Sequence, residues 1–168
     1  MNKKIEELLN AQIVKEGYSS NLYLAMASWA EAEGYAGISE WLYAQAEEEH
    51  IHMLRLLHYI NDRDGRAIIP EFEKPPVSFE SVPKLFKEVL AHERLITASI
   101  NKIVEQTLEE KDFTTDQWIQ WYVNEQIEEE KLVHQILDKL KILGNNNLYL
   151  FDRDIMSLRA PKAGTSAT

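Results

Sequence analysis

The sequence predicts an all-α fold: a four-helix bundle with one long crossover between the second and third helices and a short fifth helix at the C-terminal end. Three observations predict it. Four long stretches carry apolar residues at three- and four-residue steps, the spacing of one helical face. Short connectors join these stretches in pairs, so each pair forms an antiparallel hairpin. A longer segment that holds three of the five prolines separates the two hairpins.

The first hairpin is expected to consist of helices over residues 5–33 and 38–63, joined by a connector that begins and ends with Gly34 and Gly37. The segment 64–81 follows. Fully extended, it spans about 55–60 Å at ~3.3 Å per residue. A helix of the second stretch's length would measure only about 39 Å. The segment can therefore run the whole length of the bundle, which makes the second and third helices parallel.

Prolines and apolar residues predict that the crossover is extended and packs against the bundle. Pro70, Pro75 and Pro76 favour an extended path. Five apolar side chains are expected to hold that path against the bundle: Ile68, Ile69, Phe72, Val77 and Phe79.

The second hairpin is expected over residues 82–110 and 114–143, with Thr114 or Thr115 as the N-cap of the fourth helix. Gly144 and three asparagines stop that helix, and the apolar segment 148–158 predicts a short fifth one. Residues 161–168 lack bulky apolar side chains and are expected to be disordered. The folded domain is therefore expected to cover residues 1–160.

Charge and composition exclude several classes of function. Lysine and arginine number 18 against 28 acidic residues, and a net charge of −10 repels phosphate backbones, so no nucleic-acid partner is expected. The absence of cysteine excludes thiolate-bound metals and a thiol nucleophile. Apolar runs are too short for a membrane span, and Glu6 and Glu7 interrupt any signal sequence. A soluble cytoplasmic protein is expected.

Each predicted helix interrupts its apolar face with a carboxylate near mid-height. An antiparallel-paired bundle brings these four into one layer: Glu16, Glu49, Glu93 and Glu129. A bare carboxylate in a low-dielectric core costs several kcal/mol, and mutual repulsion adds to that cost. Cations are the natural compensation. His52 lies three residues after Glu49 on the same face and offers an imidazole nitrogen to the same metal.

A set of oxygen and nitrogen donors without thiolate suits iron or manganese, and zinc also binds such sites. Four carboxylates and a histidine supply enough donors for two metals bridged by Glu49, with Tyr23 placed to hydrogen-bond a ligating carboxylate. Taken singly, each glutamate would be read as an ordinary surface residue, and joint placement is what favours metal. The other histidines lie off the stripe centres and are interpreted as solvent or interface residues: His50, His58, His92 and His134.

Four stretches, in this order and at these separations, resemble those of bacterial non-haem ferritins: residues 16–23, 46–53, 92–97 and 120–130. The resemblance covers nearly the whole chain and implies a ferritin-like di-iron domain. It implies a first iron held by Glu16, Glu49 and His52, and a second held by Glu49, Glu93 and Glu129 with Gln126 close by. A third iron would fall on four acids: Glu48, Glu125, Glu128 and Glu129.

The resemblance also implies a function. The protein would store iron by oxidising Fe(II) with dioxygen or hydrogen peroxide and keeping ferric oxyhydroxide inside a homo-oligomeric cage of 24 subunits. Glu128 stands where a second E-x-x-H motif would place a histidine, a departure from bacterioferritins. His50 stands where bacterioferritins place a haem-binding methionine, so haem is not expected.

Two other interpretations remain open from the sequence. The first is a storage shell whose buried acids have no oxidase activity. The second is a monomeric or dimeric di-metal enzyme such as a manganese catalase or a substrate oxidase.

Overall fold

The computed structural model describes residues 1–144 and 147–159, and within these ranges the secondary structure is entirely helical. The elements are α1 (Lys3–Ala32), α2 (Ala36–Asp62), α3 (Val82–Glu109), α4 (Phe113–Leu143), α5 (Leu148–Asp154) and the short 3-10 helix η2 (Ile155–Leu158). The expected disordered tail, 161–168, lies outside the described residues. Within them, no helix is both long enough and apolar enough to cross a membrane.

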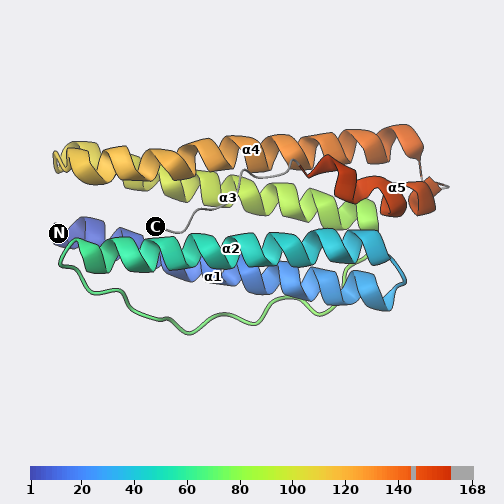
Figure 1. The fold of residues 1–168 in the computed structure, drawn as a ribbon, viewed down its shortest axis with the longest axis horizontal. Helices are drawn as coiled ribbons and strands as arrows, with labels where there is room; N and C mark the ends of the chain where they lie inside the picture. The colour runs from blue at the N-terminus through green and yellow to red at the C-terminus, as the bar shows by residue number, and fades with distance from the viewer. Residues whose placement is uncertain (145–146, 160–168) are drawn as a thin grey trace.

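The two hairpins pack on each other as two layers, α1 with α2 and α3 with α4 (Figure 1). The crossover leaves the C-terminal end of α2, runs along the outside of the bundle and enters α3 at the opposite end. The second and third helices are therefore parallel. The predicted four-helix bundle with one long crossover and a short fifth helix is confirmed.

Local signals set the ends of the long helices. The side chains of Asn2 and Ser81 accept backbone N–H groups at the starts of α1 and α3. The N-cap of α4 is Asp112, whose Oδ1 accepts the N–H of Thr115 at 3.1 Å, so the prediction of Thr114 or Thr115 was wrong. The helix begins one residue earlier than predicted, because the Asp112 carboxylate also accepts the Thr115 hydroxyl and so closes the first turn.

The start of α2 is capped from a distance. Tyr35, its N-cap residue, makes no capping hydrogen bond through its side chain. Instead, the N–H of Ile38 donates to Asp152 Oδ1 of α5 at 2.9 Å. A Cβ at Gly37 would clash with the backbone oxygen of Asp152, so the absence of a side chain there lets the two helices meet.

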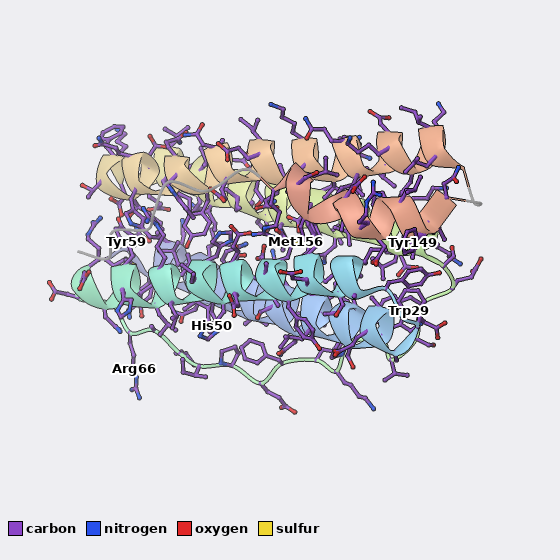
Figure 2. The ribbon with its side chains drawn as sticks, turned by 45° about the vertical axis from the view of Figure 1, so that its right-hand side comes forward. Trp29, His50, Tyr59, Arg66, Tyr149 and Met156 are labelled. Atoms are coloured by element: carbon purple, nitrogen blue, oxygen red, sulfur yellow. The ribbon has the colours of Figure 1, made fainter. Side chains whose placement is uncertain are left out.

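After α5 the chain returns along the bundle in contact with both α2 and α4. Figure 2 shows Tyr149 toward one end of the bundle and Met156, in η2, nearer its middle. The apolar segment 148–158 forms two short pieces, α5 and η2, rather than one helix. Residues 155–158 therefore lie nearer the middle of the bundle than α5 does.

The crossover is held at fewer points than the sequence predicts. Phe79 is buried, and Phe72 packs against α1 at Gly17, where a Cβ would clash with its ring. The prediction was wrong for three side chains, Ile68, Ile69 and Val77, which are 59%, 66% and 76% exposed. The crossover has no regular secondary structure, so its contacts at Phe72 and Phe79 do not bring its other apolar side chains against the bundle.

The apolar core consists of two separate clusters. One fills the end of the bundle near α5 and includes Leu42, Phe86 and Ile136, whereas the other fills the opposite end and includes Leu9, Ile100 and Ile119. Buried polar side chains occupy the intervening positions on all four long helices. The sequence therefore folds into an apolar bundle with one polar layer across its middle.

Candidate metal centre

Five ionisable side chains of the polar layer come from all four long helices. They are Glu16 of α1, Glu49 and His52 of α2, Glu93 of α3 and Glu129 of α4, and none is more than 4% exposed. Charged side chains are almost never this buried unless they are paired or bind a metal. The burial of all five therefore indicates that they pair with one another or bind a metal.

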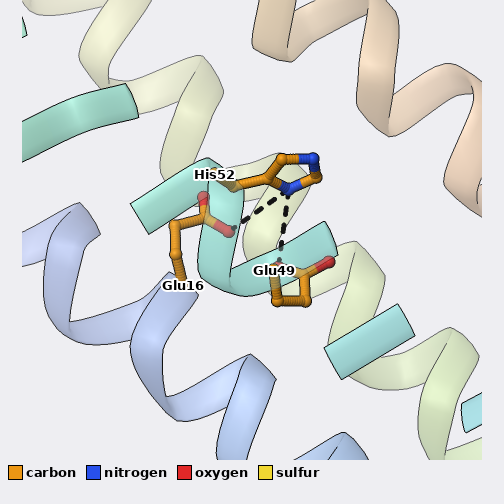
Figure 3. A group of neighbouring side chains, drawn as sticks. All are labelled: Glu16, Glu49 and His52. Carbon is orange, nitrogen blue, oxygen red and sulfur yellow. Dashed lines mark ion pairs between the residues drawn. The ribbon is translucent and has the colours of Figure 1, made fainter. Parts of the chain in front are cut away.

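Glu16, Glu49 and His52 form the tightest group. Each offers one ligand atom, and these three atoms lie within 4.8 Å of one another. His52 Nδ1 is 3.6 Å from Glu49 Oε2 and 4.0 Å from Glu16 Oε2, as the dashed lines in Figure 3 mark. Two carboxylates and an imidazole converge on a point between α1 and α2, an arrangement suited to one divalent cation.

Burial sets the protonation of these acids. Desolvation raises the pKa of Glu16 and Glu49 well above the ordinary carboxyl value, and neighbouring carboxylates raise it further. Desolvation also raises the pKa of Glu93, although hydrogen bonds from Tyr23 and Gln126 oppose that rise. Without a cation the layer therefore favours protonated carboxyls. A bound metal would take the place of those protons.

Glu93 and Glu129 are held by hydrogen-bond donors. The Tyr23 hydroxyl donates to Glu93 Oε1, and Gln126 Nε2 donates to Glu93 Oε2 at 3.0 Å. Gln45 Nε2 donates to Glu129 Oε2 at 2.9 Å. Desolvation raises the pKa of Tyr23 well above its usual value, so the phenol keeps its proton and remains a donor. These contacts fix the orientation of two acids that a second metal would need.

Further buried groups support the tight group, and sequence reasoning did not foresee them. Gln12 Nε2 donates to Glu16 Oε1 at 2.7 Å, and the Ser99 hydroxyl donates to Gln12 Oε1 at 2.7 Å. The Tyr122 hydroxyl donates to the backbone oxygen of His52 at 2.7 Å. The available signal was spacing, because Gln12 precedes Glu16 by four residues on the same buried face.

The acids assigned to a third iron occupy two places. Glu125 is 8% exposed and its Oε1 lies 3.9 Å from His52 Nε2. Glu48, Glu128 and Glu129 instead line an open cavity of about 430 Å³. Within residues 1–144 and 147–159, the Glu16 group is the only set of three that meets the 4.8 Å spacing. Among the described residues, the side chains assigned to the second and third irons therefore do not bring three ligand atoms within 4.8 Å of one another.

Three of the remaining histidines, His50, His58 and His134, are exposed as predicted. The fifth histidine, His92, is only partly exposed. Its Nε2 lies 2.7 Å from the Ser19 hydroxyl, and burial lowers its pKa to about 4. It directly precedes Glu93, and its position on α3 turns the ring inward toward α1.

Comparison with known proteins agrees with this fold. A family model described as a Ferritin-like domain matches residues 6–143. A probable bacterial non-heme ferritin-like protein of Haemophilus influenzae is 41% identical, with 94% of this chain and 97% of that protein covered. A bacterial non-heme ferritin of Campylobacter jejuni is also 41% identical, covering 94% of this chain and 96% of its own length.

Solved structures give the same result. A structure described as a novel open pore ferritin from the hyperthermophilic archaeon Archaeoglobus fulgidus superposes with a TM-score of 0.91 at 38% identity. The match covers 95% of this chain and 98% of that one. The family match covers α2, α3, α4 and all but the first three residues of α1, and the chain therefore belongs to the ferritin family.

Proposed function

We propose that this protein stores iron and oxidises Fe(II) within its buried polar layer. The observation that carries the proposal is the convergence of four nearly inaccessible glutamates and a histidine from all four helices of a ferritin-family bundle. A folded core tolerates so many acids at one level when cations neutralise them. The same site fits Zn(II) or Mn(II), and membership of the family favours iron.

Two Fe(II) ions are the proposed substrates. One binds Glu16, Glu49 and His52, and the other binds Glu49, Glu93 and Glu129, with Gln126 beside it. Each Fe(II) loses one electron, and one dioxygen molecule accepts both electrons and two protons to become hydrogen peroxide. Hydrogen peroxide is an alternative two-electron oxidant, and it would be reduced to water.

The side chains of the layer prepare this reaction. The carboxyls whose pKa burial raises give up protons as the cations bind. Tyr23 and Gln126 keep Glu93 turned toward the layer, and Gln45 does the same for Glu129. The two apolar clusters close the site toward both ends of the bundle.

The acids around the 430 Å³ cavity extend the proposal to a third iron. Glu48, Glu128 and Glu129 line that cavity, and Glu125 Oε1 lies 3.9 Å from His52 Nε2. We assign these four side chains to a metal position outside the pair, through which ferric product can leave for storage.

Storage requires a compartment, and we propose a cytoplasmic homo-oligomeric cage of 24 subunits that holds ferric oxyhydroxide. The support is the similarity, over 95% of the chain, to a ferritin described as having an open pore. Exposed apolar side chains on the long helices, such as Leu95 and Ile127 at 68% and 63%, give the subunit surfaces for association.

Particle mass and oxygen uptake test the proposal together. The metal-free protein should have the mass of a large cage, and aerobic Fe(II) should be oxidised rapidly up to about two ions per subunit. A cage without the rapid phase would indicate a storage shell that lacks oxidase activity. A particle of one or two subunits would indicate a small di-metal enzyme and contradict the cage.

A further inference from the structure

Residues 148–159, called the C-terminal segment, place a cation among the acids that line the cavity of about 430 Å³, called the outer cavity. Arg159, the last residue that the structure describes, donates through Nη2 to Glu48 Oε2 and through Nη1 to Gln45 Oε1. The ion pair joins residues 111 positions apart, and its two side chains are only 18% and 15% exposed. A sheltered guanidinium–carboxylate pair of this kind is stronger than an ordinary surface pair.

Arg159 is also connected to the buried polar layer by hydrogen bonds through Gln45. Gln45 accepts from Arg159 through Oε1 and donates through Nε2 to Glu129 Oε2 at 2.9 Å. A single amide therefore connects the C-terminal segment to an acid that the proposed function assigns to iron. Arg159, Gln45, Glu48, Glu128 and Glu129 all line the same cavity of about 430 Å³.

From this geometry we infer that Arg159 is a tethered cation that competes with the third metal ion for Glu48. The inference rests on the proposed function, because it concerns the outer metal position beside the di-iron site. The guanidinium already supplies positive charge to Glu48, so a metal that binds Glu48 must first displace it. The inner ligands do not contact Arg159: Gln12 donates to Glu16, and His52 lies beside Glu16 and Glu49.

Because of this competition, a third metal ion can bind near Glu48 only after Arg159 has left that carboxylate. The two inner ions bind first, and the third binds only when Arg159 and η2 move away from α2. Displacing Arg159 also releases Gln45, so filling the outer position loosens the hydrogen bond that holds Glu129. The C-terminal segment thereby lowers the affinity for the third metal ion relative to the affinity for the two inner ions.

Calorimetric titration of the assembled, metal-free protein with Zn(II) tests the inference. Four proteins are compared: the natural sequence, Arg159→Gln, Arg159→Lys and the control Arg153→Gln. Arg153 lies on the exposed side of α5 and pairs with its neighbour Asp154, so its loss changes net charge equally without touching the cavity. Arg159→Met keeps an apolar stem near the Trp41 ring and replaces the glutamine variant if that one does not assemble.

The expected result is two tightly bound Zn(II) ions per subunit in every protein and a third that binds more tightly once the guanidinium is gone. The third affinity should rise about ten- to a hundredfold in Arg159→Gln, the range for one lost charge-assisted hydrogen-bonded pair. Arg159→Lys, which keeps the charge, and Arg153→Gln should stay near the natural sequence. Adding Glu48→Gln to Arg159→Gln should remove the gain.

An unchanged third affinity in Arg159→Gln would overturn the inference. A weaker third site would overturn it as well, since Arg159 would then hold Glu48 in place for the metal. Failure of the proposed function looks different, because the two inner ions would then be missing from all four proteins whatever stands at position 159.

Discussion

Replacing Glu49 by glutamine should make the protein more stable than the natural sequence without metal and less stable than it when Zn(II) is bound. Glu49 is 2% exposed and Glu16 is 1% exposed, and their ligand atoms lie within 4.8 Å of each other. At an effective dielectric constant of about 20, two negative charges at that separation repel by roughly 3.5 kcal/mol. Partial protonation relieves part of this cost, and we expect the amide to stabilise the metal-free subunit by about 1–3 kcal/mol.

The gain should depend on pH with a definite sign. Burial raises the folded-state pKa of Glu49 well above its unfolded value, so its stabilising contribution is complete at low pH. That contribution is lost as pH rises through the folded-state pKa. Glutamine suffers no such loss, and its advantage is therefore largest at neutral pH and shrinks on acidification.

With Zn(II) bound, the natural protein should be more stable than Glu49→Gln. A saturating ligand at 100 times its dissociation constant stabilises the natural protein by about 2.7 kcal/mol, and the glutamine variant, which lacks the bridging carboxylate, should gain less. Scanning calorimetry measures both states. The metal-free midpoint should rise by roughly 3–10 °C in Glu49→Gln. The control Glu47→Gln alters an exposed acid of α2 and should shift neither state. A lower metal-free midpoint for Glu49→Gln, or an equal gain from Zn(II), would refute the reasoning.

Three further predictions concern neighbouring features. Tyr23→Phe removes the donor to Glu93 and should slow Fe(II) oxidation about 10–100-fold in stopped-flow absorbance, while calorimetry still finds two inner ions. Gly37→Ala should push Asp152 and α5 off the start of α2 and lower the free energy of unfolding by about 1–3 kcal/mol, measured by denaturant titration; an unchanged midpoint would contradict the tight approach. Burial lowers the pKa of His92 to about 4, so its contribution to stability is complete above about pH 6.5 and falls away toward pH 4. His92→Gln should flatten that acid loss, and identical pH profiles for the two proteins would count against a neutral, partly buried imidazole.

Much of the fold was predictable because helical periodicity and chain length act locally. The crossover is long enough to span the bundle, which allows the second and third helices to be parallel. Finer details depended on contacts that periodicity does not encode. Ile69 is exposed although it is apolar, and Asp152 caps a helix more than a hundred residues away.

The candidate site was predictable because charged residues stand at helix positions where apolar residues are expected. Glutamates on otherwise apolar helical faces identified the buried layer, because acids at such positions conflict with their surroundings. Neutral amides such as Gln12 do not conflict as strongly and were overlooked. Arg159 could not have been placed, since its position depends on how α5 and η2 fold back over α2 and α4.

Oxygen consumption during aerobic Fe(II) addition to the metal-free protein tests the central proposal most directly. The natural sequence should show a rapid phase that ends near two Fe(II) per subunit and consumes about one dioxygen for every two ions. Glu49→Ala should lose this phase while keeping the particle mass of the assembly. Rapid oxidation that survives in Glu49→Ala, or that never saturates at a fixed ratio of iron to subunit, would contradict oxidation at the buried layer.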